Sequence, residues 1–482
     1  MALKKHIVAI ATVIIITALA LLLTSTKFDS VDTLLRPPKN IGQNFEIQSA
    51  FEASVNDKYI LRSPLSGEYK SSFILVDFDN DKDDEVIVFY SLSGTPDVAR
   101  LNILDSIDGK WKSVADFESG HSQIHKVDFS DIDKDGTREI IVGWSISDTE
   151  LNNTINVYKL KSESGNIYAE KIFENSYVEF AVCDVNSDLK SDILLFDKFH
   201  SETVSLRATY FDFGNNGSKK SGEFLIDPII SSVHTISSDT DKNNGNTRFY
   251  IDGYRLDNGM TTDMFYWNNK EKTFNRYNEG NAPLLSSLAT RSTVITCKDV
   301  DNDGIIEIPF EEFINKSEVV STAKSLEKQQ NIIKWVKCRD SDLSVVHYEI
   351  FNQNNYSLKI KKDWIGNFTV INEPEKGLLT FYSAEEYSGN ESSIQEETND
   401  GYDEKFEFGF DTTINNRDNS NALFTILSTA ENESSIYDLS GYKFLKNEDG
   451  YNYFYHIYKE GKKWDITKES LKKILVTGDD EK

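Results

Sequence analysis

A nine-residue acidic motif recurs along this chain at a nearly constant interval, which limits the fold to a repeat architecture. The motif reads D-x-[DN]-x-D-x-x-x-[DE], and apolar residues follow it directly. Intact copies begin at Asp77, Asp131, Asp184 and Asp299, and the first three are spaced by about 54 residues. A decayed copy begins at Asp239, about one interval after the copy that begins at Asp184. A fixed period of this length is typical of arrays in which each repeat forms one supersecondary unit.

The spacing of the acids suits a calcium ion. Calcium takes six to eight oxygen ligands at about 2.3–2.6 Å. A tight loop can present side chains from positions 1, 3 and 5, a backbone carbonyl from position 7 and a closing carboxylate from position 9. Position 6 must turn sharply, and Gly136 and Gly304 hold it in two copies. Lys82 and Leu189 hold it in the other two, so those turns must accept a side chain.

The loop differs from an EF-hand, because its last acid stands at position 9 rather than 12 and a strand-like run follows. Without a cation, these acids would repel one another beside an apolar core. We therefore predict calcium loops with the following ligands: Asp77, Asp79, Asp81, Asp83 and Glu85; Asp131, Asp133, Asp135, Thr137 and Glu139; Asp184, Asn186, Asp188, Lys190 and Asp192; Asp299, Asp301, Asp303, Ile305 and Glu307. The alternative is a set of solvated acidic turns without metal.

That alternative is favoured for the decayed fourth copy, which contains Asp239, Asp241 and Asn243. Phe249 stands there at the place that the closing acid takes in the other copies. Without a closing carboxylate, the fourth loop lacks one of the ligands that would complete a calcium cage.

At these residues the sequence resembles the FG-GAP repeat family, as in the propellers of integrin α-subunits and in many bacterial extracellular proteins. The resemblance covers residues 70–352 and implies four-stranded blades with the calcium loop between the first two strands. Apolar runs of four to eight residues fit such strands independently of any family. The Phe-Gly and Gly-Ala-Pro tripeptides of the family are absent at the matching places. Five repeats are countable, so either the propeller is small or further blades come from unrecognised segments.

The expected fold is thus mainly β: a β-propeller of four-stranded repeats, followed by a smaller antiparallel α+β domain. Residues 27–69 form a linker that lends one strand, residues 70–352 form the propeller, and residues 353–482 form the C-terminal domain. A polar insert at 315–330 interrupts the fifth repeat. Near the C-terminus, Thr467 is placed to cap a helix that presents Leu471 and Ile474 on one face.

Residues 1–26 predict a membrane segment. Lys4 and Lys5 precede an unbroken apolar run, Ile7–Leu23, of about the length that crosses a bilayer. The positive flank would leave the rest of the chain outside the cytoplasm. We therefore expect a single-pass protein of the cell membrane with the bulk of the chain extracytoplasmic. A cleaved signal peptide and a secreted protein are the alternative.

The net charge of −27 argues against a nucleic-acid partner, which requires a basic face. Three cysteines are too few for a disulfide framework, although one bridge between Cys183 and Cys297 stays open. The sequence has no Walker loop, no dinucleotide fingerprint and no nucleophile elbow. We expect a non-enzymatic, calcium-stabilised binding module whose ligand is a protein or a cell-envelope polymer. An envelope polysaccharide hydrolase or lyase on a propeller scaffold is the alternative.

Overall fold

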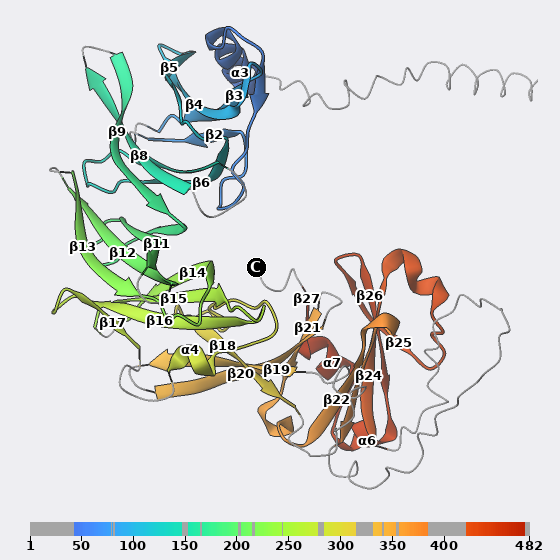
Figure 1. Ribbon diagram of the computed structural model, residues 1–482. Helices are drawn as coiled ribbons and strands as arrows, with labels where there is room; N and C mark the ends of the chain where they lie inside the picture. The colour runs from blue at the N-terminus through green and yellow to red at the C-terminus, as the bar shows by residue number, and fades with distance from the viewer. Residues whose placement is uncertain are drawn as a thin grey trace, which may run out of the picture. The chain divides into compact units, whose positions relative to one another are not determined.

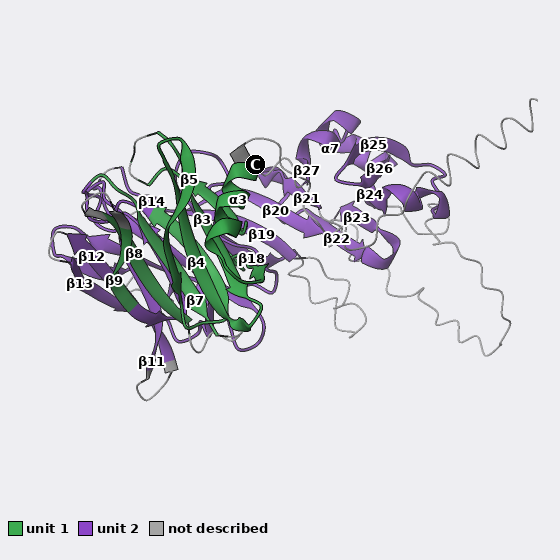
Figure 2. Cartoon of the chain, turned by 90° about the horizontal axis from the view of Figure 1, so that it is seen from above, with its two compact units in different colours: residues 1–129, 136–174 green, residues 130–135, 175–482 purple. Residues whose placement is uncertain are grey.

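The computed structural model describes residues 43–78, 80, 82–146, 153–163, 166–200, 204–214, 217–242, 244–277, 284–314, 331–339, 342–352, 356–383 and 421–477. The chain divides into two compact units, residues 1–129 with 136–174, and residues 130–135 with 175–482 (Figure 2). Antiparallel sheets of four or five strands make up most of the described chain (Figure 1). The predicted mainly β fold is therefore confirmed.

The first two sheets follow a helix, α3 (Gln43–Ser54). The first sheet contains β1 (Tyr59–Leu61), β2 (Phe73–Val76), β3 (Glu85–Leu92), β4 (Thr95–Ile107) and β5 (Lys110–Glu118). The second contains β6 (Gln123–Ser130), β7 (Glu139–Ser145), β8 (Asn153–Glu163) and β9 (Asn166–Tyr177). The strand expected within the linker is β1, which pairs with β3.

Strand β3 is a continuous apolar run because both of its faces are covered. Phe89 of β3 packs against Trp144 of β7, with ring centroids 6.0 Å apart. The next residue along β3, Tyr90, points to the opposite face and packs against Phe51 of α3. Since successive side chains of a strand alternate between faces, a strand buried on both faces is apolar at every position.

The third sheet contains β10 (Glu179–Cys183), β11 (Asp192–His200), β12 (Val204–Gly214) and β13 (Gly217–Leu225). The fourth contains β14 (Ser232–Thr240), β15 (Thr247–Tyr254), β16 (Met260–Asn268) and β17 (Thr273–Arg276). A short helix, α4 (Leu285–Leu288), precedes the fifth sheet of β18 (Glu307–Phe313), β19 (Asn331–Arg339), β20 (Asp342–Asn352), β21 (Tyr356–Ile360) and β27 (Leu475–Thr477). The strands expected from the apolar runs of the first three repeats are all present.

The fourth sheet lies between its two sequence neighbours. Phe249 and Ile251 of β15 share one core with Phe196 of the third sheet. Tyr250, between them in sequence, joins a core with Ile308 and Val336 of the fifth sheet. Sheets three, four and five therefore pack face to face within the second unit.

The C-terminal part of the chain forms a sixth sheet and adds two strands to the fifth sheet. The sixth sheet contains β22 (Phe368–Glu373), β23 (Leu378–Ser383), β24 (Ala422–Ala430), β26 (Tyr451–Ile457) and β25 (Lys443–Glu448), in that order. Three 3₁₀ turns (Lys362–Trp364, Pro374–Lys376 and Glu431–Ile436) and helices α6 (Lys459–Lys463) and α7 (Lys468–Ile474) connect the strands. β20 ends at Asn352, and β21 and β27 then extend the fifth sheet from the C-terminal side. The predicted domain boundaries themselves stay predictions.

The predicted terminal helix is α7, and its cap is as expected. The Thr467 hydroxyl accepts a hydrogen bond from the Ser470 backbone N–H at 3.1 Å, and the Ser470 hydroxyl accepts one from the Thr467 N–H at 2.8 Å. This reciprocal pair satisfies two of the donors that a helix N-terminus leaves open. Leu471 and Ile474 are buried in the core of the sixth sheet.

The prediction of a membrane-anchored protein is corrected. Within the described residues, every helix is too short or too polar to cross a membrane. The longest of them, α3, has 12 residues, whereas a bilayer requires about 20 apolar ones. The run Ile7–Leu23 lies outside the described residues, as does the insert at 315–330.

The three cysteines are free, so the alternative of a Cys183–Cys297 bridge is excluded. Cys297 and Cys338 are buried in the core between the fourth and fifth sheets, and Cys183 is half-buried. Trp144, Trp267 and Trp335 are fully buried as well. These three tryptophans therefore pack within the apolar cores of the sheets.

Candidate metal centre

The four intact acidic loops share two backbone positions with left-handed φ angles. In each of them, positions 4 and 6 have positive φ angles, although most of these residues are not glycine. The pairs are Asn80 and Lys82, Lys134 and Gly136, Ser187 and Leu189, and Asn302 and Gly304. The sequence predicted the sharp turn at position 6, including a side chain at Lys82 and Leu189, and it gave no hint of position 4. Left-handed non-glycine residues carry strain, so their recurrence at the same two places marks a specific loop shape.

Backbone hydrogen bonds to the first acid hold this shape. In the fifth loop, Asp299 accepts hydrogen bonds from the backbone N–H groups of Asp303 at 3.1 Å and Gly304 at 2.7 Å. The third loop repeats the arrangement: Asp184 accepts from Asp188 at 3.0 Å and Leu189 at 2.8 Å. The first acid therefore stabilises the turn of its own loop through hydrogen bonds within the protein.

The closing acid is anchored in the same way in three loops. Its carboxylate accepts a hydrogen bond from the N–H of position 2. The pairs are Glu85 with Phe78 at 2.7 Å, Asp192 with Val185 at 3.2 Å, and Glu307 with Val300 at 2.8 Å. This bond uses one carboxylate oxygen, and the second oxygen lies 3.4 Å from the Nζ of Lys190 in Asp192 and 3.0 Å from the Nζ of Lys337 in Glu307.

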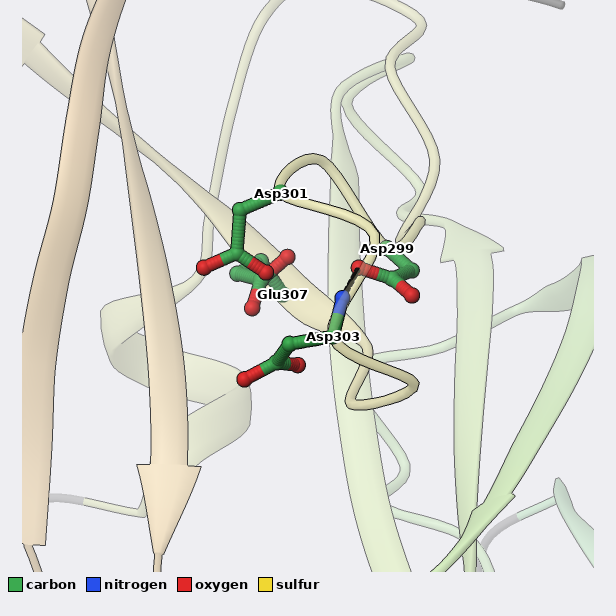
Figure 3. Close-up of side chains that lie close together, drawn as sticks. All are labelled: Asp299, Asp301, Asp303 and Glu307. Atoms are coloured by element: carbon green, nitrogen blue, oxygen red, sulfur yellow. Dashed lines mark hydrogen bonds between the residues drawn. The ribbon is translucent and has the colours of Figure 1, made fainter.

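The fifth loop brings all four of its predicted acidic side chains together. Asp299, Asp301, Asp303 and Glu307 each place one carboxylate oxygen within 4.8 Å of the others. Figure 3 shows these side chains gathered around the turn that leads into β18. Carboxylate oxygens are the hard donors that calcium, magnesium and manganese prefer. The set therefore fits a divalent cation of this class.

A positively charged group from a neighbouring strand, Lys337 of β19, lies among these acids. Its Nζ atom lies 2.6 Å from an oxygen of Asp303 and 3.0 Å from oxygens of Asp301 and Glu307. Burial alone would lower the pKa of Lys337, but the hydrogen bonds to these acids outweigh it and raise the pKa. The ammonium group therefore stays charged among the acids. Burial also raises the pKa of Glu307.

Sequence reasoning missed Lys337 for a topological reason. The lysine lies on β19, beyond the insert at 315–330, and only the pairing of β19 with β18 places it opposite Glu307. A register between distant strands leaves no local signal in the sequence.

In the second loop, Asp131, Asp133 and Glu139 form a second group, among the described residues, whose carboxylate oxygens lie within 4.8 Å of one another. Asp135, which the sequence assigned to the same ion, is exposed and outside this group. Lys159 of β8 places its Nζ 3.7 Å from Glu139. The second loop thus repeats, with three acids, the arrangement of the fifth.

The third loop gathers fewer acids. Among the described residues, the carboxylates of Asp184, Asp188 and Asp192 do not gather within 4.8 Å of one another as those of the second and fifth loops do. Lys190, predicted to contribute its carbonyl, turns its ammonium inward to contact Asp212, and the carbonyl of Phe213 accepts from it at 2.6 Å. Burial raises the pKa of Asp192 to about 7 even though Lys190 lies 3.4 Å away.

The first loop is described in part, because Asp79 and Asp81 lie outside the described residues. Glu85 is buried, and Asp77 accepts a hydrogen bond from the Lys82 N–H at 3.2 Å. Asp83 is exposed. The roles of Asp83, Thr137 and Ile305 as backbone-carbonyl ligands stay predictions.

The decayed fourth copy has a different arrangement. Phe249 stands opposite Ser238 in the β14–β15 ladder, just as Glu85 stands opposite Val76 in the first sheet. Phe249 therefore occupies the place of the closing acid, as the sequence indicated. Asp239 instead accepts a hydrogen bond from Nε of Arg248 at 2.6 Å. Asn243 lies outside the described residues.

Comparison with known proteins adds little to this geometry. No family model and no curated protein matches the chain. Among solved structures, a hypothetical selenium-binding protein from Sulfolobus tokodaii aligns with 11% identity and a TM-score of 0.26. The alignment covers 45% of this chain and 56% of that protein, so the chain spans about half its length. Similarity at this level supports no conclusion about fold or function.

Proposed function

We propose that this chain is a calcium-binding repeat protein whose sheets are blades of an FG-GAP-like propeller. The bound ions would stabilise the hairpins between the first two strands of each blade. The observation that carries the proposal is the recurrence of left-handed residues at positions 4 and 6 in four copies of the acidic motif. The gathered carboxylates of the second and fifth loops supply the oxygen donors.

The packing of the second unit supports the propeller part of the proposal. Its third, fourth and fifth sheets stack face to face through apolar cores, as successive blades do. Such a scaffold presents its loops on two rims and commonly serves recognition rather than chemistry. We therefore propose a binding module for a protein or polymer ligand as the role of the chain.

Calcium would act on stability by mass action. A site that binds the ion only in the folded state stabilises that state by about 2.7 kcal/mol when calcium exceeds the dissociation constant a hundredfold. Several such sites would raise the melting temperature of the full chain by several degrees.

Thermal unfolding of the full chain tests the proposal. We expect calcium at millimolar concentration to raise the melting temperature and a chelator to lower it. The same titration with sodium chloride at equal ionic strength controls for screening of the net charge. Melting temperatures that respond equally to both salts would contradict specific binding.

A further inference from the structure

The side chain at position 4 of an acidic loop contacts the next acidic loop along the chain. In the first loop, the Asn80 amide donates a hydrogen bond to the carbonyl of Gly136 in the second loop at 2.5 Å. In the second loop, the Lys134 ammonium donates to the carbonyl of Asp188 in the third loop at 2.7 Å. The same loop position therefore connects the first three loops in sequence order.

The third and fourth loops continue this series. The hydroxyl of Thr247, where the fourth loop enters β15, donates to the carbonyl of Asp184 at 3.0 Å. Its single proton is then used, so Thr247 accepts from the hydroxyl of Ser187, position 4 of the third loop, at 3.1 Å. Lys242, position 4 of the decayed fourth loop, donates to the carbonyl of Asp303 in the fifth loop at 3.2 Å. Each of the first four loops thus donates a hydrogen bond towards its successor.

Backbone N–H groups add contacts in the opposite direction. The N–H of Arg138, in the second loop, donates to the carbonyl of Phe78 in the first loop at 2.7 Å. The N–H of Ile306, in the fifth loop, donates to the carboxylate of Asp239 in the fourth loop at 2.8 Å. Because hydrogen bonds run both ways, a change of conformation in one loop disturbs its neighbour.

The accepting carbonyls lie beside the predicted cation ligands. Gly136 directly precedes Thr137, whose carbonyl is a predicted ligand, and Asp188 and Asp303 carry predicted ligand carboxylates. A hydrogen bond to one of these carbonyls holds the backbone that carries the ligand atoms. A cation that orders one loop also orders the donor that holds the next loop, so the next loop loses less conformational entropy when it binds its own cation.

We propose that these contacts make cation binding cooperative, so that a cation in one loop raises the affinity of the next. The inference rests on the calcium binding proposed above and adds its regulation. The fourth loop would transmit the coupling without a cation of its own. Arg248 pairs with Asp239 at 2.6 Å within that repeat, while Thr247 and Lys242 contact the loops on either side. By linkage, the effect on affinity is the same in both directions between two neighbouring loops.

The first and second loops offer the cleanest test, because their contact through Asn80 is uncharged. Asn80→Gly removes the donor, keeps the charge and suits the left-handed backbone at this position. Asn302→Gly is the matched control. Asn302 has the same loop position and a similar φ angle, 59° against 62°, but it belongs to the last copy of the motif, which no further copy follows.

Hydrogen exchange of the full chain at increasing calcium concentration measures the coupling loop by loop. Peptides that contain residues 131–139 give the calcium midpoint of the second loop. Asp77→Asn weakens cation binding in the first loop, and it keeps an oxygen that can accept from the Lys82 N–H. Peptides that contain residues 77–85 verify this loss.

We expect Asp77→Asn to raise the calcium midpoint of the second loop about fivefold, which is at the low end for coupled sites. In a chain that also carries Asn80→Gly, Asp77→Asn should shift this midpoint less than about twofold. In a chain that carries Asn302→Gly instead, the full shift should persist. The difference between these two chains is the coupling through Asn80.

Two outcomes would overturn the coupling and leave calcium binding intact. One is a second-loop midpoint that Asp77→Asn does not change. The other is the same shift with and without Asn80→Gly. Absence of calcium-dependent protection in every loop would instead overturn the proposed calcium binding, and the coupling with it.

Discussion

The fourth and fifth loops carry copies of the same acidic motif, but different positive groups lie beside their carboxylates. The fifth keeps its closing acid, Glu307, and receives a lysine from β19, the strand that pairs with β18. The fourth has lost that acid to Phe249 and pairs Asp239 with Arg248 of its own β15 strand. In both, acids beside an apolar core are matched by a positive group of the protein itself. The comparison teaches that this hairpin can place either a lysine or an arginine of the chain beside its acids.

The two cations differ in how readily an ion could replace them. The Arg248 guanidinium is held by Asp239, by the Cys338 carbonyl and by the strand that carries it. Lys337 contacts three acids with a single ammonium at the end of a flexible stem. A divalent ion offers these carboxylates twice the charge and more coordination positions. We therefore expect calcium to compete with Lys337 but not with Arg248.

The largest effect is expected at the fourth loop. Arg248→Met would leave the buried Asp239 without its charge partner and lower the free energy of unfolding by about 3–5 kcal/mol. Urea denaturation with and without calcium measures this loss, and calcium should restore none of it. The double variant Arg248→Met with Asp239→Asn should recover part of the stability. A loss that calcium reverses would show that the fourth loop still binds the ion.

An intermediate effect is expected at the fifth loop. Lys337→Met removes the ammonium from Asp301, Asp303 and Glu307, and should lower the free energy of unfolding by about 2 kcal/mol in chelator. Calcium should then raise the melting temperature by more than it does in the unsubstituted protein, because no lysine competes for the acids. Lys334→Met, at a lysine of the same strand that pairs with Glu312, is the control. An equal calcium response in both variants would refute competition.

The smallest effect concerns pH at the third loop. Burial raises the pKa of Asp192 to about 7 in the folded protein, above its ordinary value of 3.8. The folded state therefore holds this proton more tightly than the unfolded state, so the contribution of Asp192 to stability is greatest below pH 4 and falls as the pH rises to 7. Asp192→Asn should flatten this part of the stability profile, because the amide does not titrate. An unchanged profile from urea titrations in chelator would contradict the shift.

Local features were predictable from the sequence, and features that depend on distant strands were not. Strands β3 and β7 follow from apolar runs that are buried along almost their whole length. The turn at position 6 follows from Gly136 and Gly304. The helix cap at Thr467 was also predictable from the sequence. By contrast, Lys337 lies opposite Glu307 because β19 pairs with β18. Arg248 lies opposite Asp239 because β15 pairs with β14 in the decayed fourth copy. Helix α3 was missed, because its apolar residues Ile47 and Phe51 are few and match no long periodic pattern.

Isothermal titration of the full chain with calcium tests the central proposal most directly, since it counts the bound ions. Saturable binding to more than one site is expected. The double variant Asp133→Ala with Glu139→Ala should bind about one ion fewer, because it removes two of the three carboxylates gathered in the second loop. Absence of saturable heat, or an unchanged number of ions in the double variant, would contradict binding at these loops.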